Sequence, residues 1–253
     1  MAKLTVCLLT YNSERLLKEC IEPLIRVADE MVVVDSGSGD NTLAILHEHG
    51  IQAVHRAYTT HADQMNYAIS RASNDWVLCM DSDEILDPAT VDEILRLKDR
   101  LNDATMAYRI SRYWYALGRP VRALYPVSSP DFPVRLFHRS QARFNDAPVD
   151  DKVAGFGETR VIPGRVKHDT FFSLHEVFAK LNIYTSRLCQ HKQIKPSLLR
   201  ARFNPLFALV KWYVAKGGWK DGRVGVVMAA YAFLYTFLKY FKAWFLAREG
   251  RAS

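Results

Sequence analysis

The sequence is poor in cysteine. Its four cysteines, Cys7, Cys20, Cys79 and Cys189, are scattered along 253 residues, and no two of them form a C-x-x-C pair. This spacing provides neither the paired ligands of a zinc finger nor the dense disulfide framework of a small secreted domain. We therefore expect four reduced cysteines in or near a hydrophobic core, a reducing compartment, and no zinc site.

Long hydrophobic segments are also missing. Met1-Ala2-Lys3 leads directly into an apolar β-rich run without a signal-peptide pattern. The longest uncharged apolar run, residues 224–238, is shorter than the roughly 20 residues that span a bilayer. We expect a cytoplasmic protein that does not cross the membrane. With 49% hydrophobic residues, the chain suffices for one large domain with an appendage.

Acidic residues are scarce near the C-terminus. From Gln190 onward there are twelve basic residues and only two acids, Asp221 and Glu249, which gives this tail a net charge of +10. Because the whole chain carries +7, the remainder carries −3. The partner of the tail should be a polyanion or an anionic membrane surface. The basic residues are Lys192, Lys195, Arg200, Arg202, Lys211, Lys216, Lys220, Arg223, Lys239, Lys242, Arg248 and Arg251.

Strand-like and helix-like segments alternate over the first hundred residues. Continuous apolar runs at 4–10 and 76–80 are typical of strands buried on both faces of a parallel sheet. The alternation predicts an α/β fold, a mostly parallel sheet with helices on both faces. Further strands are expected at 30–34 and 51–55, and helices near Ser13, Asp40, Asp63 and Pro88.

The pattern changes after residue 103 and again after residue 172. Residues 104–172 are irregular and strand-rich, with expected strands at 106–114, 133–138 and 159–167. Residues 173–253 are expected to form a basic, aromatic-rich helical extension, with helices near 173–192, 197–215 and 222–247. We therefore divide the chain into segments 1–103, 104–172 and 173–253.

Polar clusters follow three of the predicted strands. They are Thr10-Tyr11-Asn12, Asp35-Ser36-Gly37-Ser38 and Asp81-Ser82-Asp83. Ligands of such sheets bind beyond the carboxyl ends of the strands. Two carboxylates two residues apart can divide the work there, one on a divalent cation and one on a ribose or a coordinated water. D-x-D alone is a weak motif, and a surface turn with a helix-capping aspartate is the alternative.

Asp35 ends a predicted strand in VVVDSGSGD. A carboxylate there can accept from a base N–H or a ribose hydroxyl, and Gly37 and Gly39 permit a tight turn. The alternative is a simple loop in which Asp40 caps the next helix, and we expect both roles. The loop lacks the lysine of a phosphate-binding P-loop.

Three segments resemble the family 2 inverting glycosyltransferases of the GT-A fold, a Rossmann-like architecture. They are TYNSERLLKECI, VVVDSGSGDNT and HADQMNYAISRASNDWVLCMDSDE, in this order. Later segments, HEVFAKLNIYTSRLCQH and GGWKDGRVG, are similar to the lipopolysaccharide inner-core glucosyltransferase branch. The resemblance implies transfer of a hexose from a UDP-hexose, with Mg²⁺ or Mn²⁺, to a lipid-anchored glycan such as a lipopolysaccharide core. It also implies a peripheral position at the inner face of the cell membrane.

The resemblance also implies roles for individual residues. Segment 1–103 would bind the nucleotide sugar and segment 104–172 the acceptor. Asp83 would bind the metal together with His168, although a lone histidine is more often structural. The residues implied in nucleotide-sugar binding are Thr10, Tyr11, Asn12, Asp35, Gln64, Asn66, Asp81 and Ser82.

An inverting transfer needs a general base that takes the proton of the acceptor. The inner-core branch is expected to place His followed by Glu or Asp after a strand, where this chain has Pro148-Val149-Asp150-Asp151. The carboxylate is retained in Asp151, while Asp150 replaces the histidine. Either residue is therefore a candidate base, and a solvated acidic turn is the alternative.

Two other functions compete with glycosyl transfer. A nucleotidyltransferase should have a Gly-rich loop with Lys or Arg after the first strand, which Thr10–Glu14 lacks. A nucleic-acid-binding protein would use the basic tail, but the tail has a continuous apolar face and no nucleic-acid motif. We expect no nucleic-acid partner. Trp and Tyr beside Lys and Arg suit a membrane interface, and a helical core or a dimer interface is the alternative.

Overall fold

The chain forms two compact units in the computed structural model, which describes residues 1–249. Unit 1 contains residues 1–112 and 132–168, and unit 2 contains residues 113–131 and the chain from Asp169 onward. The predicted segment 104–172 thus contributes to both units. Arg251, counted above among the basic residues of the tail, lies outside the described residues.

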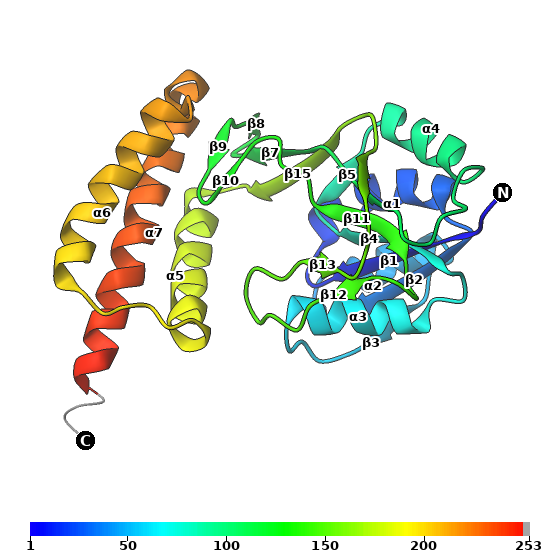
Figure 1. The fold of residues 1–253 in the computed structure, drawn as a ribbon, viewed down its shortest axis with the longest axis horizontal. Coiled ribbons are helices and arrows are strands. Elements are labelled where there is room, and N and C mark those ends of the chain that lie inside the picture. Colours follow the sequence, from blue (N-terminus) through cyan, green and yellow to red (C-terminus); the bar gives the residue numbers. More distant parts are fainter. Residues whose placement is uncertain (250–253) are drawn as a thin grey trace. The chain divides into compact units, whose positions relative to one another are not determined.

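A seven-stranded sheet lies at the centre of unit 1, in the order β14-β6-β11-β4-β1-β2-β3 (Figure 1). The four strands β4, β1, β2 and β3 are parallel, and only β11 runs antiparallel to its neighbours. The predicted α/β fold is therefore confirmed. The bounds are β1 Leu4–Thr10, β2 Glu30–Asp35, β3 Ala53–His55, β4 Trp76–Asp81, β6 Ala107–Arg109, β11 Val134–His138 and β14 Thr159–Val161.

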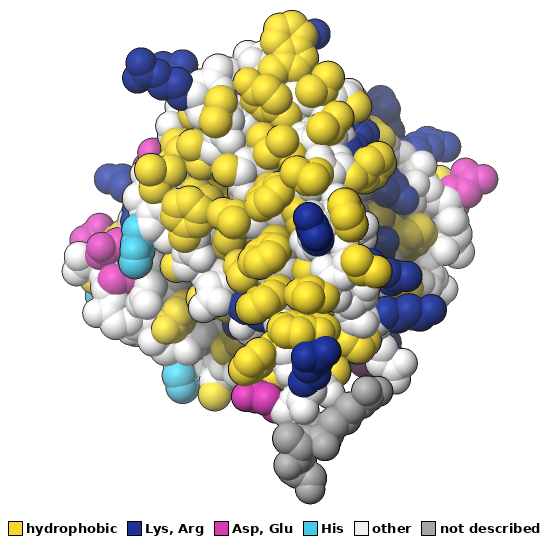
Figure 2. All heavy atoms as spheres, turned by 90° about the vertical axis from the view of Figure 1, so that its left-hand side faces the viewer, with side chains coloured by type: hydrophobic (Ala, Val, Ile, Leu, Met, Phe, Trp, Pro, Cys, Tyr) yellow, Lys and Arg dark blue, Asp and Glu magenta, His cyan; other side chains and the backbone are white. Residues whose placement is uncertain are grey.

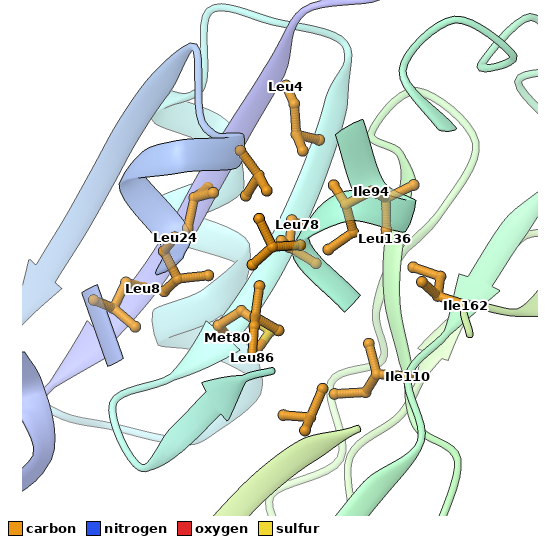
Figure 3. Close-up of a cluster of buried hydrophobic side chains, with 14 of the residues drawn as sticks. Leu4, Leu8, Leu24, Leu78, Met80, Leu86, Ile94, Ile110, Leu136 and Ile162 are labelled. Carbon is orange, nitrogen blue, oxygen red and sulfur yellow. The ribbon is translucent and has the colours of Figure 1, made fainter. Parts of the chain in front are cut away.

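The two central strands bury both of their faces, as their continuous apolar sequences predict. Leu8 and Met80 belong to a core on one face of the sheet, and Cys7 and Cys79 belong to a core on the other. Figure 3 shows the first core, in which Leu136 of β11 lies near Leu78 of β4 and Ile94 of α4. A sheet buried in this way holds the carboxyl ends of its strands in fixed positions.

Helices cover both faces of this sheet. Residues of α1, α2 and α4 contribute to the core that contains Leu8, and residues of α3 contribute to the opposite core. Ser13 precedes α1 but makes no side-chain capping bond, and Asn41 rather than Asp40 takes the cap position of α2. The bounds are α1 Glu14–Val27, α2 Thr42–Glu48, α3 His61–Arg71 and α4 Pro88–Leu97.

Two of the predicted long strands are broken by turns. The expected strand 106–114 becomes β6 and β7 (Arg112–Ala116), and 159–167 becomes β14 and β15 (Val166–Phe171). Gly164, at a φ of +116°, lies in the second break, where an added Cβ would be 2.6 Å from the Thr90 nitrogen. β15 then pairs with β5 (Glu84–Leu86), which sets His168 opposite Glu84. The short strands β12 (Arg143–Phe144) and β13 (Val153–Ala154) also pair.

Unit 2 is mainly helical. Its helix α7 packs against both α5 and α6 (Figure 1), around a core that includes Phe171, Leu181 and Met228. The three predicted helices are thus confirmed, and a π-helical turn η1 extends α6. The bounds are α5 Leu174–His191, α6 Leu198–Val210, η1 Lys211–Ala215, η2 Gly218–Asp221 and α7 Gly222–Glu249, and the short strands are β8 Arg119–Pro120, β9 Ala123–Leu124 and β10 Val127–Ser128.

One helical stretch, Gly218–Glu249, is long and apolar enough to cross a membrane by length and composition, with a mean hydropathy of 1.5 over its most apolar window. The sequence expectation counted only the uncharged run and therefore missed this length. Core helices of globular proteins meet the same criterion, and 44% of the window is buried. All four cysteines are free, and three of them are buried, as expected.

Candidate functional site

The three polar clusters meet at one edge of the sheet. The parallel register sets Thr10 beside Asp35 and Leu9 beside Asp81. Side chains also join the loops, because the hydroxyl oxygens of Ser13 and Ser82 are 2.7 Å apart. The predicted position of a site beyond the carboxyl ends of β1, β2 and β4 is consistent with this geometry.

Asp35 organises the loop after β2. One of its carboxylate oxygens accepts from the Gly37 and Ser38 backbone N–H groups at 2.9 and 2.8 Å, and the other accepts from Thr10 Oγ1 at 2.8 Å and from Ser38 Oγ. Burial by itself would raise the pKa of Asp35, but these hydrogen bonds hold the pKa below its usual value. Asp35 is therefore an anion whose two oxygens are both engaged.

Asn12 joins the first two loops. It adopts a φ of +48°, its Oδ1 accepts from the Gly39 N–H at 2.9 Å, and its own N–H donates to Ser38 Oγ. The neighbouring Tyr11 is 62% exposed. This edge of the sheet therefore presents an exposed aromatic side chain next to two loops that hydrogen bonds hold together.

Asp81 is anchored by two cationic side chains. Its oxygens are 3.0 Å from His61 Nε2 and 2.9 Å from Arg135 Nη2. Arg135 also donates to the buried Glu84 at 2.6 Å, as does Arg112 at 2.7 Å. Burial opposes ionisation of Asp81, but the charges of His61 and Arg135 outweigh it and hold its pKa well below the usual range.

His61, the first residue of α3, connects Asp81 to Asp151. Its Nδ1 lies 2.8 Å from Asp151 Oδ2, so that each ring nitrogen faces a carboxylate. A ring that donates from both nitrogens is an imidazolium. Burial favours the neutral ring, but Asp81 and Asp151 outweigh it and raise the pKa of His61 to about 10.

Sequence reasoning missed His61. Its contact with Asp151 joins residues 90 positions apart, which no local pattern reveals. The one available signal was a histidine in the first turn of a helix, since a cation is unfavourable at that end unless anions offset it.

The two predicted metal ligands, Asp83 and His168, do lie together. His168 Nε2 is 3.1 Å from Asp83 Oδ2, because β15 pairs with the strand that follows the D-x-D turn. The turn connects β4 to β5, and Asp87 rather than Asp83 caps the next helix. Within residues 1–249, no group of three or more His, Cys, Asp or Glu residues is placed to hold a metal ion.

The two candidate bases differ in position. Asp151 is 16% exposed at its side chain and contacts His61, whereas Asp150 is exposed and has a φ of +60°. The Phe144 ring packs edge-on against the His61 ring at 5.6 Å between centroids. The geometry therefore brings Asp151, and not Asp150, beside Asp81.

Gln64 and Asn66 lie behind these loops. Gln64 is fully buried, donates to Ser36 Oγ at 3.0 Å, and accepts from Arg56 at 3.1 Å. Asn66 exchanges two hydrogen bonds with the Phe144 backbone, at 2.9 and 3.0 Å. Gln64 thus holds the Ser36 side chain of the loop after β2, and Asn66 holds the backbone of strand β12, which leads to Asp151.

Comparison with known proteins identifies the family of the chain. The model of Glycosyl transferase family 2 matches residues 5–151, more than half of the chain. The chain is 27% identical over 250 residues to the lipopolysaccharide core biosynthesis glycosyltransferase LpsC of Rhizobium meliloti, covering 93% of this chain and 89% of that protein. It is 26% identical to a glycosyltransferase of Rickettsia typhi, with 85% and 76% covered.

The fold is also similar to that of a solved enzyme. Glucosyl-3-phosphoglycerate synthase from Mycobacterium tuberculosis, in complex with Mn²⁺, uridine diphosphate and phosphoglyceric acid, superposes with a TM-score of 0.51. The identity is 17%, and the match covers 78% of this chain and 80% of that one. At this identity the likeness concerns the GT-A fold alone.

Proposed function

The chain belongs to glycosyl transferase family 2, and from this membership we propose that it moves a hexose from a UDP-hexose, such as UDP-glucose, to a lipid-anchored glycan with inversion at C1. The likeness to LpsC along nearly the whole chain supports a lipopolysaccharide core as the acceptor class. UDP and Mn²⁺ in the similar synthase structure make these the first ligands to test.

The proposal rests on two groups of side chains that lie at the D-x-D turn. Asp83 lies against His168, and Asp81 is linked through His61 to Asp151. A group that binds diphosphate and a group that takes a proton are the two parts that an inverting transfer requires. Both parts come from unit 1.

Asp83 and His168 fit a divalent cation, because a carboxylate and an imidazole together are ligands that Mn²⁺ accepts. Such a cation, bound as Mg²⁺ or Mn²⁺, would offset the charge of the departing diphosphate. Since no third His, Cys, Asp or Glu joins this pair within residues 1–249, the remaining ligands of the cation would be phosphate oxygens of the donor and water.

In this proposal Asp151 is the general base. Its Oδ2 is held by His61, while its Oδ1 makes no hydrogen bond within the described part of the chain and is open to the acceptor hydroxyl. The proton of the acceptor moves to this oxygen as the acceptor attacks C1. His61 acts as a positioning residue, because it fixes Asp151 relative to Asp81.

The nucleotide would bind over the loops after β1 and β2. Tyr11 offers an exposed ring for the base, and Thr10 and Asn12 keep the loop of Asp35 in place. In this proposal Ser82 and Asp81 contact the ribose or the sugar of the donor. In this proposal the enzyme works in the cytoplasm, peripherally at the inner face of the cell membrane, where its donor and a lipid-anchored acceptor meet.

The test is metal-dependent donor binding. We expect the melting temperature to rise with UDP and Mn²⁺ together, and Asp83→Ala to abolish both this shift and sugar transfer while the protein stays folded. Asp99→Ala, at an exposed carboxylate of unit 1, is the matched control and should behave as wild type. Full turnover by the Asp83 variant would refute the metal assignment.

A further inference from the structure

Helix α6 is apolar on two opposite faces. Its inner face, formed by Ala201, Pro205 and Ala208, is buried, and α6 packs on α7. Its outer face carries large apolar side chains that are 53–70% exposed. We call these the α6 row: Leu199, Phe203, Leu206, Phe207 and Val210.

The α6 row belongs to a wider apolar surface of unit 2. Val214 and Trp219, which follow α6, are 58% and 54% exposed, and Phe245 and Leu246 of α7 are about half exposed. Figure 2 shows hydrophobic side chains spread over this face, with Lys and Arg side chains around them. A contiguous exposed apolar surface of this kind marks an interaction site.

The charge along the segment that carries the α6 row has one sign. Residues 190–220 contain seven Lys and Arg residues and no Asp or Glu. Asp221, the next residue, is 2% exposed at its side chain and is paired with Arg122 at 2.6 Å. The partner must therefore present negative charge next to an apolar phase.

We propose that the α6 row inserts into the headgroup region of an anionic lipid leaflet, with α6 lying in the plane of the membrane. An apolar helix face with a basic margin is the pattern of an interfacial helix. The inference deepens the proposed function, on which it rests, because it names the surface that meets the leaflet of a lipid-anchored acceptor.

A second copy of the chain is a poorer partner. A twofold dimer would set the same surface of each copy against the other, and so would bring two basic segments together. Like charges placed opposite one another oppose association. An anionic leaflet instead gains from each of these charges.

Helix α7 is a poorer membrane element than α6, despite its length. Met228, Tyr231 and Ala232 are at most 3% exposed, and they belong to the core of unit 2. Lys242 Nζ donates to Asn182, Thr185 and Ser186 of α5, at 2.7–2.9 Å. Spanning a bilayer would remove α7 from these contacts, whereas insertion of the α6 row removes none.

The experiment measures binding of the full chain to vesicles. We compare three proteins. They are wild type, an α6 variant that combines Leu199→Gln, Phe203→Gln and Phe207→Gln, and a control variant in unit 1 that combines Ile25→Gln, Leu43→Gln and Val161→Gln. The side chains replaced in the control are 41–48% exposed. The vesicles contain phosphatidylglycerol and phosphatidylcholine, or phosphatidylcholine alone. Circular dichroism checks folding, and calorimetry with UDP and Mn²⁺ checks the donor site.

We expect wild type and the control to bind the anionic vesicles, and the α6 variant to partition at least about tenfold less, with UDP binding unchanged in all three. Equal partitioning of the α6 variant, or equal binding of wild type to phosphatidylcholine alone, would overturn the inference. So would a wild-type dimer that the α6 substitutions dissociate. Absent UDP binding with this vesicle pattern intact would refute the proposed function instead.

Discussion

Asp150 and Asp151 are neighbours in sequence but have different surroundings. Asp151 is held by the His61 ring beside Asp81, while Asp150 is exposed. Which of the two aspartates contacts His61 is therefore decided by the loop backbone, in which Asp150 takes a φ of +60° and so turns the chain between the two side chains.

The two aspartates should respond differently to the same substitution. Asp151→Asn keeps the shape but cannot take a proton, so we expect kcat to fall by about 10²-fold or more. UDP-hexose binding should stay near wild type, and Asp150→Asn should be mild. Steady-state kinetics and calorimetry measure both effects. A damaging Asp150 variant with a mild Asp151 variant would exchange the roles.

The imidazolium of His61 should make stability depend on pH. Its pKa rises from 6.5 to about 10 on folding, so its contribution is fully present below pH 6.5 and is lost as the pH rises through 10. We expect His61→Gln to lower the melting temperature most at pH 6.5, with a smaller difference at pH 10. His47→Gln, at an exposed histidine, is the control. A difference that does not change with pH would show that the charge of His61 is not responsible.

At the scale of elements, the corner between η1, η2 and α7 depends on glycine. A Cβ on Gly225 would lie 1.9 Å from the Gly218 carbonyl oxygen, and a Cβ on Gly218 would lie 2.8 Å from that of Trp212. Both neighbours are backbone atoms, which cannot rotate away. The GGWKDGRVG segment thus has a structural reason for two of its glycines.

Substitution at this corner should therefore destabilise unit 2. Alanine favours a helix over glycine by about 1 kcal/mol, but the clash in Gly225→Ala should outweigh this, for a net loss of about 2 kcal/mol. Urea unfolding followed by tryptophan fluorescence measures it, since four of the five tryptophans belong to unit 2. Gly39→Ala, where an added Cβ meets nothing within 4 Å, is the control. A Gly225 variant as stable as wild type would show that the backbone at this corner can shift to accept the added Cβ with little loss of free energy of unfolding.

At the scale of the whole molecule, charge is divided along the chain. The tail from Gln190 carries +10 and the rest carries −3. The tail is therefore the part of the chain that an anionic surface attracts. The candidate site lies in unit 1, so the proposed chemistry and the proposed docking belong to different parts of the chain.

Binding to anionic vesicles should therefore weaken with salt and with loss of tail charge. Each basic residue near an anionic leaflet contributes about 1 kcal/mol to binding. A triple variant that combines Arg200→Gln, Lys211→Gln and Lys216→Gln should therefore have a partition coefficient about 10²-fold lower at low salt. At about 1 M salt, where screening acts within about 3 Å, the difference from wild type should largely vanish. The control is a triple variant in unit 1 that combines Lys3→Gln, Arg71→Gln and Arg96→Gln. An equal loss of vesicle binding in both variants would show that the basic residues of the tail have no special role in binding.

The sequence by itself determined the order and type of the main elements and three of the loops at the candidate site. Asp35 and Asp81 were found because each follows a continuous apolar run, which is a local signal of a buried parallel strand. Helix α5 was found from its apolar spacing, and the structure adds that the Ser173 side chain caps it by accepting from the Glu176 N–H.

Tertiary structure alone decided which of these residues meet. The link from Asp81 through His61 to Asp151 depends on how a loop returns to the sheet 90 residues later, and the engagement of Asn66 with Phe144 depends on the same return. Likewise α6 is apolar on both faces, so its periodicity gives no preferred side. Only the packing of Ala208 against α7 leaves Phe207 exposed, because a local pattern records which side chains are apolar but not which neighbour covers them.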